Sequence, residues 1–141
     1  MFHFSQRSKG NLDTCHPDLQ IIAEVAIQII DFAVIQGHRG EEEQNAAYWA
    51  GKSKLKFPAS KHNTDPSLAF DVIPYINGKF AGWNNREAFV QLAGVLKGVA
   101  LGLYYTKRIE HVLRWGGDWD RDNDLKDQDF IDLPHLELIK P

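Results

Sequence analysis

Residues 60–71 read SKHNTDPSLAFD, and residues 132–135 near the carboxyl end read DLPH. The first stretch supplies His62 and Asp71, and the second supplies His135 with Asp132 three residues before it. Two imidazoles and one carboxylate form a three-ligand protein site for zinc, with a fourth position left for water or substrate. A spare carboxylate beside such a site can accept a proton from the attacking water. The two stretches therefore predict a metal-dependent hydrolase.

The spacing of these residues constrains the fold. His62 and Asp71 are nine residues apart, which does not fit one face of a helix, so a loop that folds back must bring them together. Pro134 fixes one backbone torsion and favours extended backbone before His135. Because such backbone turns about once every three residues, Asp132 and His135 can point the same way. Asp132 would then lie close to the metal without binding it.

Length and composition indicate one globular domain spanning residues 1–141, with 43% hydrophobic and 25% charged residues. The formal net charge of -3 argues against a nucleic-acid-binding protein, which would present a basic face. We expect a monomer. The single cysteine, Cys15, excludes an internal disulfide. Some large aromatic residues could line a substrate groove, although core packing is the expected role of most of them: Trp83, Tyr104, Tyr105, Trp115 and Trp119.

No apolar run long enough to cross a bilayer is expected, because the longest, residues 21–35, is interrupted by Glu24, Gln28 and Asp31. Residues 1–8 lack the charged-then-apolar layout of a secretory signal. We therefore expect a protein that stays in a cytoplasm until something else releases it.

Hydrophobic periodicity and turn residues predict helices alternating with short strands. Helices are expected at residues 17–30, 41–50 and 84–99. Strands are expected at residues 32–36, 68–73, 111–115 and 134–139. Asn84 and Glu87 form a possible capping box for the third helix, and Pro74 is expected to end the second strand. Helices with a small, mostly antiparallel sheet give an α+β fold class.

An acidic segment precedes the DLPH stretch. Its carboxylates alternate as in oxygen-rich calcium loops, at Asp118, Asp120, Asp122, Asp124 and Asp129. Asn123 stands where such loops usually have glycine, and an aspartate replaces the final glutamate, which should weaken binding. Two interpretations stay open: a calcium site that orders the Asp132–His135 segment, or a solvated acidic loop.

Several motifs occur in a fixed order: SKH at 60–62, AFD at 69–71, WGGDW at 115–119 and DLPHLEL at 132–138. In this order they resemble the D-alanyl-D-alanine carboxypeptidase and L-alanyl-D-glutamate endopeptidase family of zinc peptidases. The resemblance runs from about residue 4 to residue 138, and the short form is similar to phage endolysins of the group. It implies a hedgehog-type, DD-peptidase-like α+β fold and activity on the peptide stems of bacterial peptidoglycan.

Carried over position by position, the resemblance makes His62, Asp71 and His135 the zinc ligands and Asp132 the catalytic base. The spacing between the first histidine and the aspartate is commonly shorter in the family than the nine residues found here. The longer loop makes Asp65 a rival ligand, but Asp71 keeps the local pattern and is favoured.

Three further residues have counterparts in the family. Arg39 matches an arginine that steadies the developing oxyanion or the substrate, a role that suits a permanently charged guanidinium. Ser60 matches a serine beside the site and is expected to bind substrate. Gln44 lies on the helix after the arginine, where a structural role is at least as plausible.

The resemblance implies a zinc-dependent endolysin that cleaves L-alanyl-D-glutamate bonds in peptidoglycan, waiting in the bacterial host cytoplasm before release. The nearest alternative is a D-alanyl-D-alanine carboxypeptidase. A second alternative is a non-catalytic, zinc-containing wall-binding domain. Zinc suits the ligand types, although cobalt or manganese could occupy the same ligands in vitro.

Overall fold

The computed structural model describes residues 1–141 and contains helices packed around a small antiparallel sheet. The helices are α1 (Gln6–Asp13), α2 (Pro17–Ala26), α3 (Glu41–Trp49), the 3-10 helix η1 (Lys61–Asn63) and α4 (Arg86–Tyr105). The strands are β1 (Phe32–Gln36), β2 (Ala69–Ile76), β3 (Lys79–Phe80), β4 (Val112–Trp115) and β5 (His135–Ile139). The strand order is β1-β2-β5-β4, with β3 paired to β2, and every pair is antiparallel. The α+β class is therefore confirmed.

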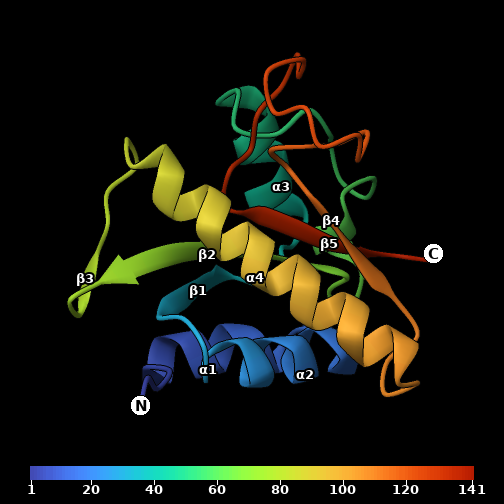
Figure 1. Ribbon diagram of the computed structural model, residues 1–141. Coiled ribbons are helices and arrows are strands. Elements are labelled where there is room, and N and C mark those ends of the chain that lie inside the picture. Colours follow the sequence, from blue (N-terminus) through green and yellow to red (C-terminus); the bar gives the residue numbers. More distant parts are fainter.

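The core lies between the sheet and three of the helices. Helix α4 crosses the sheet diagonally, α1 and α2 lie along one end, and α3 lies at the opposite end with the long loops (Figure 1). Buried side chains of α2 and α4, such as Ile22 and Leu92, share one cluster with Val34, Phe70 and Trp115 from the strands or their ends. The loops and α3 are thus left free to surround the opposite end of the sheet.

Several expected boundaries are wrong. Helix α2 ends at Ala26 rather than at residue 30, and α4 continues to Tyr105 rather than ending at residue 99. The cap of α4 is Asn85 rather than Asn84: its side chain accepts from the backbone N–H of Ala88 at 3.1 Å. Strand β2 also continues through Pro74, which pairs with Phe32 of β1. The carbonyl of Pro74 faces β3 rather than β1, so its missing N–H removes no bond to β1.

By length and composition alone, α4 is apolar enough to cross a membrane. The expectation that no such run exists was based on residues 21–35 and is therefore wrong. The apolar residues of α4 have another explanation here. Leu92, Leu96 and Ala100 are buried, and they belong to the cluster that contains Ile22 of α2 and Leu113 of β4. The helix serves as the core helix of this fold.

Candidate metal centre

The fold brings His62, Asp71 and His135 together. Asp71 of β2 and His135 of β5 are cross-strand partners, and η1 places His62 beside them. The Nε2 atom of His62 lies 3.1 Å from Asp71 Oδ1 and 3.1 Å from His135 Nδ1. The remaining pair, His135 Nδ1 and Asp71 Oδ1, is 3.3 Å apart. Residues distant in sequence thus bring three atoms that can bind a metal ion close to one point.

The other ring nitrogens fix the orientation of both imidazoles. Nδ1 of His62 lies 2.8 Å from the carbonyl oxygen of Gly37, so this nitrogen must carry the hydrogen. Nε2 of His135 lies 2.9 Å from a carboxylate oxygen of Glu137 and donates to it in the same way. In neutral rings, the two nitrogens that face Asp71 are therefore bare acceptors. Three acceptors without a donor between them call for a cation.

The electrostatics of the cluster point in the same direction. Burial alone would raise the pKa of Asp71, but the charges and hydrogen bonds of His62 and His135 lower it strongly. Burial alone would lower the pKa of His135, yet hydrogen bonds to Asp71 and Glu137 raise it to about 9. The cluster therefore favours positive charge at its centre.

The donor spacing fits zinc. Tetrahedral zinc with bonds of about 2.0–2.1 Å places neighbouring ligand atoms about 3.3–3.4 Å apart. The three distances of 3.1, 3.1 and 3.3 Å lie within a few tenths of an ångström of that spacing. Asp65, the rival ligand considered from sequence, is exposed and does not belong to this cluster.

Glu137 lies at the site, although no role for it is predicted from the sequence. It is 6% exposed and accepts from Arg114 Nη2 at 2.7 Å, while Lys61 Nζ lies 3.7 Å away. Burial would raise its pKa, but the hydrogen bonds from His135 and Arg114 lower it to about 2. The available signal was the two-residue step from His135, which puts both side chains on one face of β5.

Asp132 lies beside the cluster without belonging to it. Burial and the negative charge of Asp71 raise the pKa of Asp132 to about 6. Its backbone is fixed by close packing: its N–H donates to Gly116 O at 2.8 Å, and a Cβ on Gly116 would overlap the Asp132 carbonyl. Trp115 also donates from Nε1 to Leu133 O at 2.7 Å. The WGGDW motif thus fixes the position of the segment that carries Asp132 and leads into β5.

Arg39 reaches the cluster from the segment before α3. Its Nη2 lies 3.4 Å from Asp71 Oδ2, and its Nη1 donates to Gln44 Oε1 at 3.1 Å. Gln44 is fully buried and also donates to Ser53 Oγ and to the carbonyl of Leu55. This glutamine is structural: it joins the arginine to the loop after α3.

Ser60 has a structural contact at the site. Its Oγ accepts from the backbone N–H of His62 at 3.2 Å and so caps η1, which orients the histidine. Ser60 also lines the cavity beside the cluster. Its expected contact with substrate stays a prediction.

Part of the acidic loop clusters as expected. Asp118, Asp120 and Asp122 approach one another, whereas Asp124 and Asp129 lie outside this group. Oδ2 of Asp118 accepts from the N–H of Asn123 at 3.1 Å, and Asn123 adopts a left-handed backbone, which asparagine tolerates. Oδ1 of Asp118 is buried without any hydrogen-bond partner.

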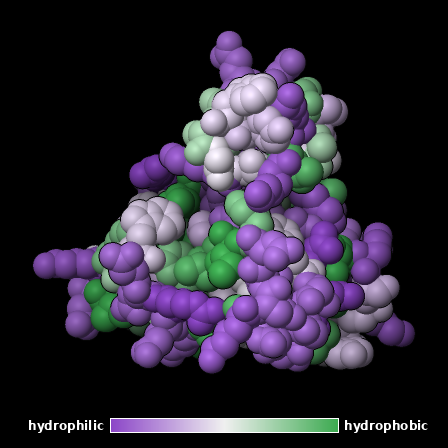
Figure 2. All heavy atoms as spheres, turned by 90° about the horizontal axis from the view of Figure 1, so that it is seen from above, coloured by the Kyte–Doolittle hydropathy of each residue, from purple (hydrophilic) through white to green (hydrophobic).

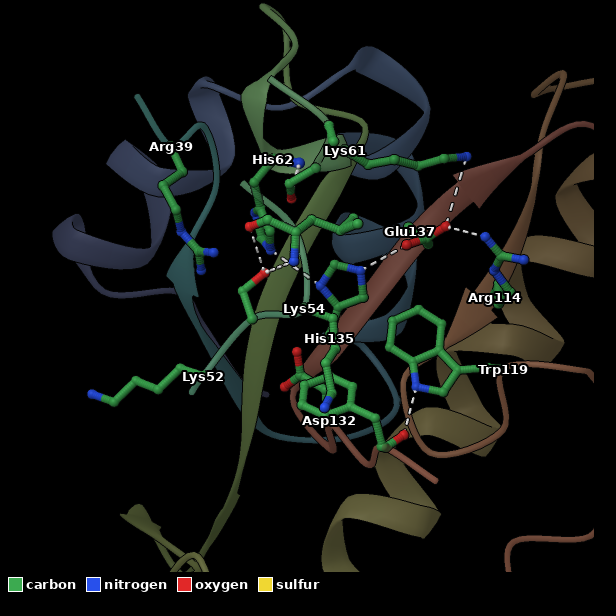
Figure 3. A pocket seen from close by; sticks show the side chains of 15 residues that line it. Arg39, Lys52, Lys54, Lys61, His62, Arg114, Trp119, Asp132, His135 and Glu137 are labelled. Atoms are coloured by element: carbon green, nitrogen blue, oxygen red, sulfur yellow. Dashed lines mark hydrogen bonds and ion pairs between the residues drawn. The ribbon is translucent and has the colours of Figure 1, made fainter. Parts of the chain in front are cut away.

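Two cavities open beside the cluster. The first, of about 410 Å³, is bordered by His62, His135 and Asp132 (Figure 3). The second, of about 1040 Å³, reaches Asp71 and shares four lining residues with the first: Arg39, Lys52, Phe130 and Asp132. Trp119 lines the first and Trp83 the second, whereas Trp115 is core. An extended substrate could therefore pass over the cluster from one cavity to the other.

Comparisons with known proteins agree with this geometry. The family model described as phage L-alanyl-D-glutamate peptidase matches residues 1–139. The L-alanyl-D-glutamate peptidase of Escherichia phage T5 is 38% identical over 148 residues, covering 98% of each chain. The crystal structure of the Serratia marcescens L-Ala D-Glu endopeptidase ChiX superposes with a TM-score of 0.73 at 25% identity. That match covers 97% of this chain and 90% of ChiX.

Proposed function

The chain belongs to the family of phage L-alanyl-D-glutamate peptidases, and we propose that it hydrolyses the L-alanyl-D-glutamate bond in peptidoglycan stem peptides. The observation that carries the chemistry is the convergence of three acceptor atoms beside the half-buried carboxylate of Asp132. A binding domain without catalysis would not need that carboxylate in the cavity.

His62, Asp71 and His135 would hold the metal, and zinc is the ion that their types and spacing fit best. Bound there, zinc would supply Lewis-acid chemistry: it lowers the pKa of water and polarises a carbonyl. Gly37 and Glu137 keep the two imidazoles in the orientation that exposes their free nitrogens.

Asp132 is the proposed general base. Its raised pKa suits a group that takes a proton from the attacking water and passes it to the leaving amine. Arg39 orients Asp71 through its Nη2, and its permanent charge can also stabilise negative charge that develops on the substrate carbonyl oxygen. Ser60 would help to position the peptide at the cavity wall.

We further propose that the protein is a monomeric, single-domain endolysin that acts on the wall after another protein has opened the host membrane. The similarity to the enzyme of phage T5 over nearly the whole chain supports this assignment. Release of the protein into the medium only when a membrane-permeabilising partner is co-expressed would test it.

Digestion of purified peptidoglycan, with and without a chelator, tests the activity. Mass spectrometry should find stem peptides freed at L-alanine, with D-glutamate as the new amino terminus, and the chelator should abolish them. Loss of only a terminal D-alanine would identify a carboxypeptidase instead. Binding to the wall without any new product would identify a non-catalytic domain.

The loop formed by residues 118–124 is proposed to bind a divalent cation, with calcium favoured by its oxygen donors. The partnerless, buried Oδ1 of Asp118 supports this proposal, because a buried carboxylate oxygen normally has a partner. Calorimetric titration of calcium into zinc-loaded protein should give heat and a higher melting temperature, and Asp118→Asn should remove both. Absence of both effects in the unmodified protein would contradict it.

A further inference from the structure

The two cavities beside the metal centre differ in charge. We call the 410 Å³ one the cationic cavity and the 1040 Å³ one the apolar cavity. Five cationic side chains line the cationic cavity: Arg39, Lys52, Lys54, Lys61 and Arg114. Only two carboxylates, Asp132 and Glu137, line it with them. An anionic part of a substrate would therefore be drawn to this side of the centre.

Most of these cations already have acidic partners. Arg39 lies 3.4 Å from Asp71, while Arg114 and Lys61 lie 2.7 and 3.7 Å from Glu137. Lys52 and Lys54 form no ion pair. The charge available to a ligand is thus the charge of these two lysines.

Lys54 is held at the cavity by its surroundings. Its ammonium lies 5.4 Å from the ring centre of Phe130, which lines the same cavity, within the range of a cation–π contact. The residues on either side, Ser53 and Leu55, both accept from the buried amide of Gln44, at 3.0 and 2.6 Å. The backbone that carries Lys54 is therefore fixed to α3. Ligand binding then costs little conformational entropy in this part of the loop.

The apolar cavity has a different lining. It includes Ala46, Ala47, Ile131 and Leu133, with Trp83 exposing 58% of its surface. Two cations also line it, but they are outnumbered by three carboxylates: Arg39 and Lys52 against Glu43, Asp71 and Asp132. Figure 2 shows the molecule from above: apolar surface lies in the middle of that view, and polar side chains surround it. The apolar part of this lining suits a methyl side chain or the apolar face of a sugar ring, and its excess of carboxylates over cations disfavours an anionic group.

We propose that Lys54, assisted by Lys52, binds the free carboxylate of the D-glutamate on the amine side of the scissile bond. D-Glutamate has two carboxyl groups and only one continues the stem peptide, so a carboxylate remains close to the bond that is cut. The stem then lies with D-glutamate in the cationic cavity and its L-alanine end over the apolar cavity. This inference rests on the proposed function and assigns the direction in which the substrate binds.

The test compares two synthetic stem peptides that differ only in this group, one with the free carboxylate and one with a carboxamide. The unmodified, zinc-loaded enzyme should prefer the carboxylate by about fivefold in kcat/KM, the upper size expected for a charge pair with solvent-exposed lysines. Lys54→Gln should reduce the preference to about twofold by raising KM for the carboxylate peptide, with kcat nearly unchanged, because uniform binding is what is lost. The Lys52→Gln/Lys54→Gln double variant should remove it.

Lys56→Gln is the matched control. It lies on the same loop, but its ammonium sits 4.6 Å from the ring centre of Trp49 and 5.0 Å from that of Tyr48, and it does not line the cationic cavity. It should leave the preference unchanged. Equal cleavage of both peptides by the unmodified enzyme, or an undiminished preference in the folded double variant, would overturn the inference. Cleavage of neither peptide by the unmodified enzyme would instead contradict the proposed function itself.

Discussion

The protein contains two His–Asp–His clusters, and their hydrogen bonds differ. The candidate centre is formed by His62, Asp71 and His135, and the second cluster by His16, Asp18 and His111. In the second, His111 Nδ1 lies 2.7 Å from Asp18 Oδ2, and His16 Nδ1 accepts from the N–H of Asp18 at 3.0 Å. Its polar atoms thus bond to one another.

The difference lies in the outer contacts of the imidazoles. At the candidate centre, Gly37 and Glu137 take up the outer N–H groups, so free lone pairs face Asp71 and a cavity. In the second cluster, the ring nitrogens nearest Asp18 already have hydrogen-bond partners. Asp18 also accepts from the N–H of Glu110 at 3.0 Å. That cluster ties the start of α2 to the turn before β4. Identical residue types therefore leave lone pairs facing a cavity in one place and are bonded to neighbouring groups in the other.

The largest contrast should come from single histidine replacements in the two clusters. His62→Ala removes a proposed ligand and should abolish measurable peptidoglycan hydrolysis, whereas His16→Ala should keep nearly all of it. Turbidity assays on purified walls, with melting temperatures to check folding, measure both. Comparable losses of activity in two folded variants would remove the distinction between the clusters.

Asp132→Asn tests the chemistry of the candidate centre apart from its metal. Without the carboxylate, the proton of the attacking water has no nearby acceptor, so kcat should fall by about 10²–10⁴-fold. Bound zinc, measured by elemental analysis, should stay unchanged because Asp132 is outside the ligand cluster. Full activity in this variant would refute the role of Asp132 as base.

Glu137→Gln tests the outer contact that distinguishes the centre. An amide oxygen can still accept from His135 Nε2, but the charge that strengthens this hydrogen bond is lost. Zinc affinity should fall by about 10–100-fold, the usual effect of a changed outer partner. Competition with a zinc-binding dye measures it. Glu110→Gln, near the second cluster, is the control and should leave zinc affinity unaltered.

The smallest effect is expected for Asp18→Asn, which should lower the free energy of unfolding by about 1 kcal/mol at pH 7 and spare activity. Burial alone would raise the pKa of Asp18, but hydrogen bonds from His111 and the Glu110 backbone lower it. A lowered carboxyl pKa gives stability that is present above the ordinary value of 3.8 and lost as pH falls through the folded-state pKa. Urea unfolding should therefore show that the unmodified protein and Asp18→Asn differ less in free energy of unfolding under acid conditions than at pH 7. A difference that does not change with pH would contradict this.

The sequence allowed the three residues of the candidate centre to be predicted as a group, because their types and the order of the motifs are typical of a metal site. Strand β1 was predicted with its observed bounds, since its apolar run stops at a glycine. Helix α1 was not predicted, because its polar residues show little apolar periodicity and only Ser8 and Leu12 are buried. The hydrogen bonds of Glu137 and Gln44 depend on residues brought close by tertiary packing, which local patterns do not encode.

Titration of zinc into chelator-treated protein tests whether His62, Asp71 and His135 bind the metal, with Asp71→Asn and Asp18→Asn variants beside the unmodified chain. We expect one zinc ion per chain for the unmodified protein and for Asp18→Asn, and strongly weakened binding for Asp71→Asn. Unweakened binding in Asp71→Asn, or loss of binding in a folded Asp18→Asn variant, would contradict it.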